Sequence, residues 1–566
     1  MLKFEEKDMA AALPDSTNHL VLLVSSNELV TFSLHNYFDD SDITIHAVSG
    51  KTDAVKSLKQ DKFAAVIIDI CQDLDEGMEL RHLVRGLDER IPILFLTPLD
   101  CWSDVRLLGQ IGKDTHSYYI PENADRNFML SRLTQAMGAY QAENSLSLLK
   151  TKIGRNWFLA SLLQHAMLPP WVYFCDQYEF SCLYRPFTQV SGDLFEWLPL
   201  DEGRALFVFG DVSGHGTHSA LAMTAIQSFL TQVVMLDKER ATHPELMASE
   251  INNFFCQHLH NIVYMSTLIA YIDFNQNYIR YQNAGYMDFF CVDSETGEAL
   301  DINPDRKGSI PPGLVRDTVY TESDNVEYHF PDSAVFMLSS DGLMDLSKDK
   351  AGKKSMDMEM CKRLTSILMK DAQKENKSIA VPFRCLHSLE QFGYTCPQDD
   401  LSMVMLRKPL RSEKLYVFSC RVPTDKKAVD EICQKASAFV TDHYHDENLS
   451  VGTELLLEEY LVNIIMHGLN EYEKLNEYIA VELCAYPEEL KLIIWDRGKE
   501  WNGLFMTPER AEESMDQLNE TMSASGRGIP IICTIASQIS RQRYCGLNET
   551  IFIIPRQGRD HDKESR

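Results

Sequence analysis

The chain has 566 residues, and its 83 acidic residues against 54 basic ones give a formal net charge of −29. A single hydrophobic core does not organise this length, so we expect three to four domains. The charge argues against nucleic-acid binding, because phosphate backbones would be repelled. The acidic N-terminus is unlike a signal peptide, and no apolar run approaches the roughly 20 residues needed to span a bilayer. The 14 cysteines form no CxxC pair, which favours reduced thiols. We therefore expect a cytoplasmic protein that binds neither nucleic acid nor a membrane.

Residues 17–138 alternate short apolar runs with helical stretches, which predicts a doubly wound parallel sheet. The runs are VLLV at 21–24, AAVIID at 64–69, PILFLT at 92–97 and SYYIP at 117–121. Asp69 ends the second run, at the sheet edge where such folds place ligands, and Thr97 ends the next. This pattern resembles the receiver domain of response regulators, and the resemblance makes Asp69 a candidate phosphoacceptor.

The receiver pattern is degenerate. Ser25 and Ser26 stand where receivers carry an acidic pair that holds Mg²⁺, and Ile120 stands before Pro121 in place of a lysine. Without those carboxylates, little charge remains to bind Mg²⁺ or to stabilise a transferring phosphoryl group. Two interpretations stay open. In one, Asp69 is still phosphorylated; in the other, the domain signals through protein contacts or not at all.

Residues 171–408 are strand-rich, with two helical stretches, and carry four aspartate motifs. The motifs are VSGDLFEW, FGDVSGHGTHSAL, SSDGLMD and QDDLSMVML, with the aspartates Asp193, Asp211, Asp341 and Asp399. Hard divalent ions prefer carboxylate oxygens, and two ions need several aspartates held on rigid strand ends. Such ions clamp a phosphate and activate a water molecule for attack, so no covalent nucleophile is required. The motifs predict metal-dependent phosphate hydrolysis.

The ordered motifs resemble the PPM-type serine/threonine phosphatases, in the bacterial SpoIIE/RsbU branch. The resemblance implies an α/β/β/α sandwich holding two Mg²⁺ or Mn²⁺ ions. It makes Asp193 and Asp211 catalytic, and the implied metal ligands are Asp193, Asp211, Asp341, Asp399 and the backbone carbonyl of Val212. Asp400 takes a neighbouring position. The segment NAGY at 283–286 resembles a family signature, with Tyr286 in place of the usual histidine.

Residues 139–170 form a predicted helical linker. Apolar residues recur at roughly helical spacing until Pro169 and Pro170 stop the pattern: Leu149, Ile153, Trp157, Leu162 and Met167. The segment matches the regulatory helix that precedes phosphatase domains of this branch. It would mediate a homodimer or couple the receiver-like domain to the phosphatase; alternatively, it packs only on its own domain.

Residues 412–556 read as strand, helix, long helix and strands. In the predicted helix at 454–470, Glu459, Asn463 and His467 are four residues apart and line one face. An asparagine there can bind the Mg²⁺ that bridges ATP phosphates, and a glutamate one turn earlier can accept a proton. Asp496 ends an apolar strand, placed to accept a hydrogen bond from an adenine amino group. The glycines of SGRGI at 525–529 can bring backbone amides against phosphates.

This set resembles the GHKL ATPase fold, in the branch of anti-sigma serine kinases such as RsbW. The resemblance implies an α/β sandwich that binds ATP with Mg²⁺. It makes Glu459 the general base, Asn463 the Mg²⁺ ligand and Asp496 the adenine reader, in a pocket also formed by Gly498, Gly526, Arg527 and Gly528. No phosphoacceptor-histidine helix precedes the domain, which disfavours a histidine kinase, and His467 is interpreted as structural. The alternative is an ATP-binding module that sequesters a partner without catalysis.

The order of modules in this multidomain α/β chain resembles receiver–phosphatase–kinase regulators of bacterial partner switching. The resemblance implies a bifunctional regulator that phosphorylates and dephosphorylates a serine or threonine of a STAS-domain anti-sigma-factor antagonist. The alternative is a sequestering protein that binds a sigma factor or an anti-sigma factor, with an active phosphatase and a non-catalytic C-terminal module. A dedicated phosphatase with a vestigial ATPase is a third reading.

Overall fold

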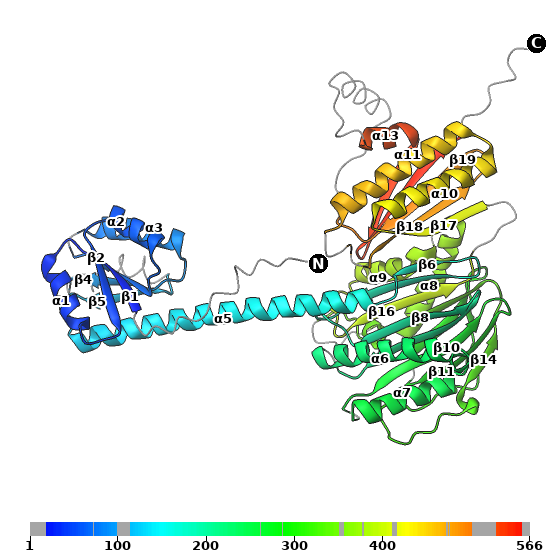
Figure 1. Cartoon of the computed structure of the whole chain (residues 1–566), viewed down its shortest axis with the longest axis horizontal. Helices are drawn as coiled ribbons and strands as arrows, with labels where there is room; N and C mark the ends of the chain where they lie inside the picture. Colours follow the sequence, from blue (N-terminus) through cyan, green and yellow to red (C-terminus); the bar gives the residue numbers. More distant parts are fainter. Residues whose placement is uncertain are drawn as a thin grey trace, which may run out of the picture. The chain divides into compact units, whose positions relative to one another are not determined.

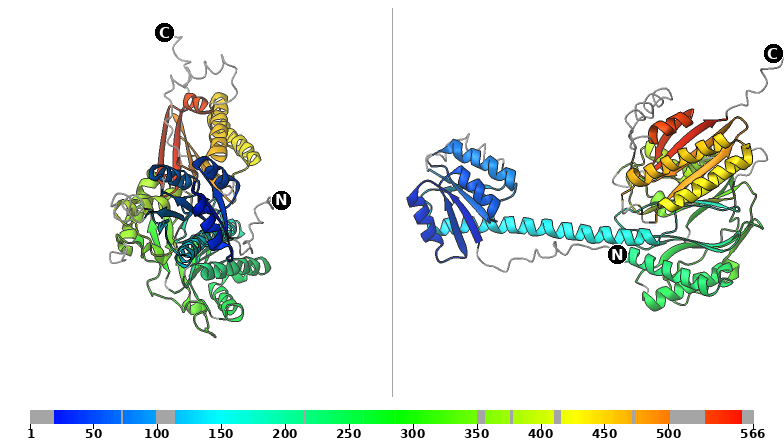
Figure 2. Two further views of the ribbon diagram at one scale, coloured as in Figure 1. Left: turned by 90° about the vertical axis from the view of Figure 1, so that its left-hand side faces the viewer. Right: turned by 45° about the horizontal axis from the view of Figure 1, so that its top comes forward.

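A computed structural model describes residues 19–71, 73–98, 114–214, 216–260, 262–285, 287–349, 356–375, 378–409, 416–470, 474, 476–500 and 528–556 (Figure 1). The chain divides into two compact units, Met1–Asn156 and Trp157–Arg566. Each unit is described by itself below, and Figure 2 gives two further views of the elements.

The first unit is built on a parallel five-stranded sheet in the order β2-β1-β3-β4-β5. Its elements are β1 (His19–Val24), α1 (Glu28–Phe38), β2 (Ile43–Val48), α2 (Lys51–Gln60), β3 (Ala65–Asp69), α3 (Leu74–Leu87), β4 (Ile93–Thr97) and β5 (Ser117–Pro121). Separate apolar clusters cover the two faces of the sheet, so the doubly wound prediction is confirmed. The sequence pattern missed β2, because this edge strand alternates buried and exposed residues instead of forming an apolar run.

A single helix, α5 (Arg126–Met167), runs from the first unit into the second. Its first part packs Met129 and Leu133 against the parallel sheet. The helix ends just before Pro169, as the sequence predicts. Leu149 and Ile153, midway along it, are more than half exposed. The homodimer expected through this helix stays a prediction.

The next domain stacks two antiparallel sheets. One sheet has the order β14-β11-β10-β9-β8 and the other β13-β12-β15-β16-β7-β6. The strands are β6 (Val172–Phe174), β7 (Glu179–Arg185), β8 (Asp193–Asp201), β9 (Arg204–Val212), β10 (Met265–Asp273), β11 (Tyr278–Ala284), β12 (Asp288–Asp293), β13 (Ala299–Leu300), β14 (Val326–His329), β15 (Ala334–Ser339) and β16 (Leu401–Arg407). A large apolar core, including Phe207 and Phe336, fills the space between the sheets.

Helices cover both outer faces of this stack. Helices α6 (Thr217–Leu236) and α7 (Pro244–His258) lie on the first sheet, and α8 (Met358–Glu375) and α9 (Val381–Gln391) lie on the second (Figure 1). The predicted α/β/β/α sandwich is therefore confirmed. The prediction of two helical stretches in residues 171–408 was wrong, because the described residues contain four α-helices. Their polar outer faces weaken the apolar signal in the sequence.

Helix α6 corrects a further expectation from the sequence. At Thr217–Leu236 it is long and apolar enough to cross a membrane by length and composition, although we expected no such segment. In the structure its side chains Met223, Ile226 and Leu230 are fully buried in the core of the sandwich. The buried side of the helix thus packs against the β8–β9 sheet, while Leu221, Met235 and Leu236 are exposed.

The last domain has a five-stranded antiparallel sheet in the order β17-β18-β19-β21-β20. Its elements are β17 (Tyr416–Pro423), α10 (Lys426–Tyr444), α11 (Glu447–Asn463), a π-helical turn (Ile464–Gly468), β18 (Tyr478–Ala485), β19 (Glu489–Asp496), α13 (Gly528–Ile535), β20 (Gln538–Tyr544) and β21 (Leu547–Pro555). Helices α10, α11 and α13 pack on one face, which confirms the predicted α/β sandwich.

The other face of this sheet packs against the second domain. Ala480, Ile493, Trp495 and Leu547 are fully buried in a cluster that also contains Phe383 and Leu386 of α9. Side chains alternate between the two faces of a strand, so one set fills the domain's own core and the other fills this shared core. The two domains of the second unit therefore share a hydrophobic core.

Candidate phosphatase and nucleotide sites

Two of the predicted aspartates sit side by side on neighbouring strands. Asp193 at the start of β8 pairs directly with Asp211 near the end of β9. Asp193 is 1% exposed, and neither of its carboxylate oxygens accepts a hydrogen bond from the described part of the chain. Burial, and then the charge of Asp211, raise the pKa of Asp193 well above its usual range. Two adjacent buried carboxylates are stable as anions only when a cation lies between or beside them.

The opposite sheet supplies the next pair. Asp341 follows β15 and Asp399 precedes β16, and these strands are antiparallel neighbours. Gly342 lets the two loops approach, because a Cβ at that position would lie 1.9 Å from the carbonyl oxygen of Asp400. Burial is the main cause that raises the pKa of Asp211 to about 8, and the charges of Asp341, Asp399 and Asp400 raise it further. The structure thus brings all four predicted aspartates into one electrostatically coupled group at the edges of both sheets.

Asp400 differs from its neighbour Asp399 in what it contacts. One Asp400 oxygen accepts a hydrogen bond from Phe187 N at 2.7 Å, and the other accepts one from Gly192 N at 2.8 Å. Both oxygens therefore hold the loop that leads into Asp193. Asp399 accepts a hydrogen bond from the backbone N–H of Asp400 at 2.8 Å. Asp400 therefore connects the two sheets through hydrogen bonds and, over the described ranges, Asp399 does not, a difference that the sequence Asp-Asp at 399–400 does not reveal.

The donor set fits hard divalent ions, because it consists of carboxylates, and the buried one, Asp193, has two oxygens that accept no hydrogen bond from the described residues. Val212 is buried, and its carbonyl oxygen lies 3.0 Å from the position a Cβ would take on Gly192, so it faces the Asp193 loop. Its role as a ligand stays a prediction, like the roles of the four aspartates. Asn283 of the NAGY segment bonds the backbone N–H and carbonyl of Met287, which is a turn contact, and Tyr286 lies outside the described residues.

Sequence reasoning missed Gln164, which lies on α5 and is 5% exposed. Its amide donates to the carbonyl of Ser191 at 2.8 Å and accepts from the backbone N–H of Ser191 at 3.0 Å. Ser191 in turn accepts a hydrogen bond from Asp193 N through its hydroxyl at 3.0 Å. The last turns of α5 therefore hold the loop that carries Asp193. A glutamine among apolar residues at helical spacing was the available signal.

The nucleotide site begins where α11 meets the start of α13. A Cβ at Gly528 would lie 2.5 Å from Glu459 Oε2 and 3.3 Å from Asn463 Nδ2, so these three residues are in close contact. Among the residues that the structure describes, Asn463 Nδ2 is buried and has no hydrogen-bond partner. A buried amide beside a carboxylate and a helix N-terminus suits polyphosphate with a bound cation.

Asp496 ends β19 and is 2% exposed. Its Oδ1 accepts hydrogen bonds from Gly498 N at 2.9 Å and from the Asn548 side chain at 2.8 Å, while Oδ2 is buried without a partner. Burial raises the pKa of Asp496. An oriented carboxylate with one vacant oxygen fits an amino-group donor such as adenine. Sequence reasoning missed Asn548, which lies far along the chain in β21.

Other predicted residues fall in different places. The helix expected over 454–470 does not continue as an α-helix, because α11 ends at Asn463 and a π-helical turn follows. His467 lies in this turn and is exposed, so it does not extend the face formed by Glu459 and Asn463. Gly526 and Arg527 lie outside the described residues.

Both oxygens of Asp69 in the first unit have partners. Ser25 Oγ donates to one at 2.7 Å, and Cys71 N donates to the other at 3.0 Å. Thr97 is 1% exposed, and its hydroxyl donates to the carbonyl of Ile120 at 3.3 Å. Ser25 therefore occupies the place beside Asp69 where receivers carry a carboxylate, and phosphorylation of Asp69 stays a prediction.

Comparison with known families agrees with this division of the chain. Residues 201–409 match the family model described as stage II sporulation protein E (SpoIIE), and residues 422–554 match the one described as histidine kinase-like ATPase domain. The chain therefore carries a SpoIIE-type phosphatase domain followed by a histidine kinase-like ATPase domain. Below, these are called the phosphatase domain and the ATPase domain.

Individual relatives are distant. The phosphoserine phosphatase RsbP of Bacillus subtilis (strain 168) is 26% identical over 179 residues, which are 30% of this chain and 40% of RsbP. The chain thus matches less than half of that relative's length. Among solved structures, the RsbU and RsbW domains of a Mycobacterium tuberculosis protein are 14% identical, cover 67% of this chain and 92% of their own, and give a TM-score of 0.36. The SiaA PP2C domain of Pseudomonas aeruginosa is 19% identical, covers 46% and 98%, and gives a TM-score of 0.37.

Proposed function

We propose that this chain is a two-way regulator that removes phosphate from a serine or threonine of a partner protein and also adds it back from ATP. The observation that carries the proposal is the presence of two chemically complete sites in one compact unit. One is a cluster of aspartates around the buried carboxylate of Asp193, and the other is a pocket with a carboxylate, an amide and an adenine-type aspartate. We place both reactions in the cytoplasm, where ATP is available.

The phosphatase site would hold two Mg²⁺ or Mn²⁺ ions on Asp193, Asp211, Asp341 and Asp399. When bound, the ions supply charge for the phosphate oxygens and a water molecule acidic enough to attack phosphorus. The chain's own residues fix this geometry. Asp400 holds the Asp193 loop through two backbone amides, and Gln164 holds it from the other side through Ser191.

The ATPase site would bind the adenine amino group at Asp496 Oδ2 and the Mg²⁺-bound phosphates beside Asn463 and the start of α13. Glu459 is placed to accept the proton from the hydroxyl of the partner's serine. The serine oxygen then bonds to the γ-phosphorus as the bond to the β-phosphate oxygen breaks, and ADP leaves. Because Glu459 contacts the same glycine as Asn463, the base and the phosphate-binding end of the pocket are adjacent.

The partner class we propose is a STAS-domain antagonist of an anti-sigma factor. The support is the similarity to the phosphoserine phosphatase RsbP over part of the chain, together with the succession of phosphatase and ATPase domains. A phosphoserine dianion on a docking surface adds charge and a desolvation cost there, so one modification can change which protein the partner binds.

A paired phosphate-transfer assay tests the proposal. Wild type, Asn463→Ala and Asp211→Ala each receive labelled ATP with Mg²⁺ or Mn²⁺ and a STAS-domain protein, and separately receive the same protein already phosphorylated. We expect Asp211→Ala to accumulate the phosphorylated partner and Asn463→Ala only to remove phosphate. If no variant labels the partner although ATP binds, the C-terminal domain is a sequestering module. If Asp211→Ala removes phosphate at the wild-type rate, the metal-site assignment is wrong.

A further inference from the structure

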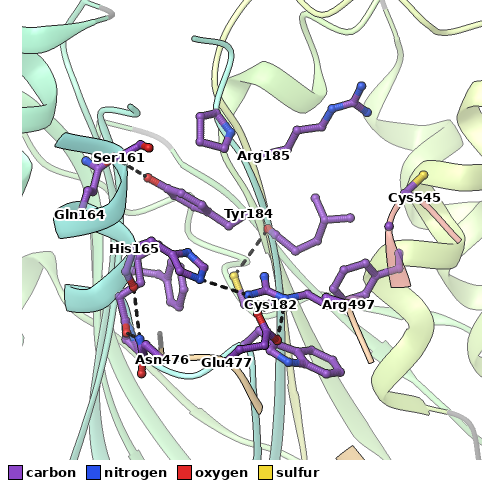
Figure 3. A pocket seen from close by; sticks show the side chains of 18 of the residues that line it. Ser161, Gln164, His165, Cys182, Tyr184, Arg185, Asn476, Glu477, Arg497 and Cys545 are labelled. Carbon is purple, nitrogen blue, oxygen red and sulfur yellow. Dashed lines mark hydrogen bonds and ion pairs between the residues drawn. The ribbon is translucent and has the colours of Figure 1, made fainter. Parts of the chain in front are cut away.

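Adjacent residues at the end of α5 face two different sites. Gln164 bonds the backbone of Ser191, two residues before Asp193 of the phosphatase site. Its neighbour His165 approaches the ATPase domain, where its Nε2 lies 3.5 Å from the guanidinium of Arg497 (Figure 3). Arg497 lies between Asp496 and Gly498 in the predicted adenine loop. One turn of helix therefore contacts a loop of each catalytic centre.

The contact on the ATPase side consists of several partly buried hydrogen bonds. Asn476 donates its side-chain amide to the carbonyls of His165 at 3.2 Å and Leu168 at 2.7 Å, so it caps the C-terminal end of α5. The next residue, Glu477, accepts hydrogen bonds from Arg497 on both carboxylate oxygens, at distances between 2.5 and 3.1 Å. Just beyond the helix, Trp171 Nε1 donates to the carbonyl of Tyr478 at 2.8 Å.

These bonds form a connected route between the sites. It runs from the adenine loop through Arg497 to Glu477, through the neighbouring Asn476 to the end of α5, and through Gln164 to the Asp193 loop. Gln164 and Glu477 are the buried members of this route, so a broken bond at either leaves an unsatisfied group out of water. If bound nucleotide moved the adenine loop, it would therefore change the free energy of the α5 end.

We propose that nucleotide bound to the ATPase domain changes the rate of the phosphatase domain through the end of α5, with Asn476 as the positioning residue that joins the two sites. This inference rests on the proposed function. Coupling of binding is reciprocal, so occupancy of the phosphatase site changes nucleotide affinity by the same factor. Such a link keeps the chain from phosphorylating and dephosphorylating its partner at the same time.

The test uses the full chain and a non-hydrolysable ATP analogue. The rate of hydrolysis of an aryl phosphate is measured with and without saturating analogue, and analogue affinity is measured separately. We expect the analogue to change wild-type kcat/KM about fivefold or more, the usual lower range of coupling between sites. Asn476→Gly should reduce that change below twofold while both separate activities remain, because glycine accepts the positive φ of 56° at this position.

The control is Arg421→Gln, since Arg421 stacks on Tyr173 and Tyr478 between the same two domains but outside the network. It should respond to the analogue like wild type. An unchanged wild-type rate with the analogue bound, or an Asn476→Gly variant that responds like wild type, overturns the inference. If wild type hydrolyses no aryl phosphate, or binds no analogue, the proposed function is overturned instead.

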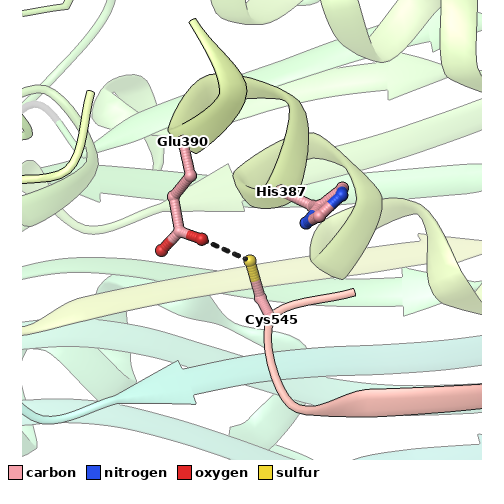
Figure 4. A group of neighbouring side chains, drawn as sticks. All are labelled: His387, Glu390 and Cys545. Atoms are coloured by element: carbon pink, nitrogen blue, oxygen red, sulfur yellow. Dashed lines mark hydrogen bonds between the residues drawn. The ribbon is translucent and has the colours of Figure 1, made fainter. Parts of the chain in front are cut away.

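A separate cluster between the same domains has the chemistry of a metal site. His387 and Glu390 lie three residues apart on α9, and Cys545 lies in the β20–β21 turn of the ATPase domain. Their donor atoms all lie within 4.8 Å of one another (Figure 4). Imidazole, carboxylate and thiol are together the donor set of a borderline-soft ion such as Zn²⁺.

Neighbouring residues orient this cluster. Arg185 bonds Glu390 Oε1 at 2.7 Å, which leaves Oε2 to face Cys545 Sγ at 3.3 Å. The side-chain nitrogen of Gln391 donates to Nε2 of His387 at 3.0 Å, so a metal ion bound at Nε2 would displace Gln391. We infer that His387, Glu390 and Cys545 form a Zn²⁺ site that joins the β20–β21 turn of the ATPase domain to α9 of the phosphatase domain.

Cobalt reports this site directly, because a thiolate bound to Co²⁺ gives a charge-transfer absorption that an all-oxygen site does not. The full chain is titrated with Co²⁺ under reducing conditions. We expect the thiolate band in wild type and its loss in Cys545→Ser. In His387→Ala, the affinity for Co²⁺ should fall at least about tenfold. The control Cys256→Ser removes another half-buried thiol and should keep the band. No band in wild type, or a band that survives in Cys545→Ser, overturns the inference.

Discussion

Gly342 gives the sharpest test of how the phosphatase site is assembled. The change is Gly342→Ala, which adds a single methyl group between the loops carrying Asp341 and Asp399. The added Cβ would lie 1.9 Å from the carbonyl oxygen of Asp400 and 2.7 Å from its carbonyl carbon. Both are backbone atoms, so no side-chain rotation relieves the overlap.

The magnitude follows from the distance that must open. Real Cβ contacts stay above 3.0 Å, so the Asp341 and Asp399 loops must separate by an ångström or more. A misplacement of about 1 Å in a positioned site costs roughly 100-fold in rate. Overpacking of this kind also costs about 1–3 kcal/mol of stability. We therefore expect an aryl phosphatase rate about 100-fold below wild type in a protein that still folds.

The assay measures kcat at saturating Mn²⁺, beside thermal unfolding of the same samples. Gly86→Ala is the matched control, because that glycine lies in α3 with nothing within 4 Å of the added methyl group. It should keep the wild-type rate. A Gly342→Ala variant that hydrolyses the substrate at the wild-type rate would refute the contact between the two loops and the site built on it.

Three further predictions address the other groups. Gly528→Ala places a methyl group 2.5 Å from Glu459 Oε2, so we expect at least about tenfold weaker phosphorylation of the partner and an unchanged rate of aryl phosphate hydrolysis; equal loss of both activities would contradict it. Asp496→Asn replaces the vacant acceptor oxygen or turns a donor toward adenine, so ATP affinity, measured by calorimetry, should fall about tenfold or more, and an unchanged affinity would remove Asp496 from the pocket. In metal-free protein, the pKa of Asp211 is raised from 3.8 to about 8, so the folded state binds this proton more tightly than the unfolded state. The resulting stability is complete below about pH 4 and is lost as pH rises through 8. This contribution amounts to at most about 6 kcal/mol. Denaturant unfolding with a chelator at pH 5 and pH 8 measures most of it, and Asp211→Asn should flatten the dependence.

The sequence pattern predicted the layers and the aspartate motifs, because both depend on local signals. Apolar runs fixed four of the five parallel strands, and aspartates beside glycines marked the strand ends. The edge strand β2 was missed, since half of its residues face away from the core. More α-helices occur in residues 171–408 than the pattern predicted, because the polar faces of amphipathic helices such as α8 and α9 hide the apolar stripe.

Contacts between distant segments could not be predicted from spacing. Asp399 and Asp400 are adjacent in the sequence, and only the pairing of β16 with β7 shows that Asp400 reaches the Gly192 loop. Asn548 joins the Asp496 carboxylate from more than fifty residues away, because β19 and β21 are neighbours in the sheet. Gln164 reaches the loop that carries Asp193 because the end of α5 packs beside the start of β8.

The shared core between the phosphatase and ATPase domains limits how this chain can be divided. Trp495, Ile493 and Leu547 are fully buried against α9, so cutting the chain at residues 410–415 would expose a large apolar face on the ATPase piece. Such a fragment would self-associate or recruit a foreign surface, and its behaviour would describe that new contact. The two domains are therefore not exchangeable parts: a substitute for either one would need an apolar face that fits this same core.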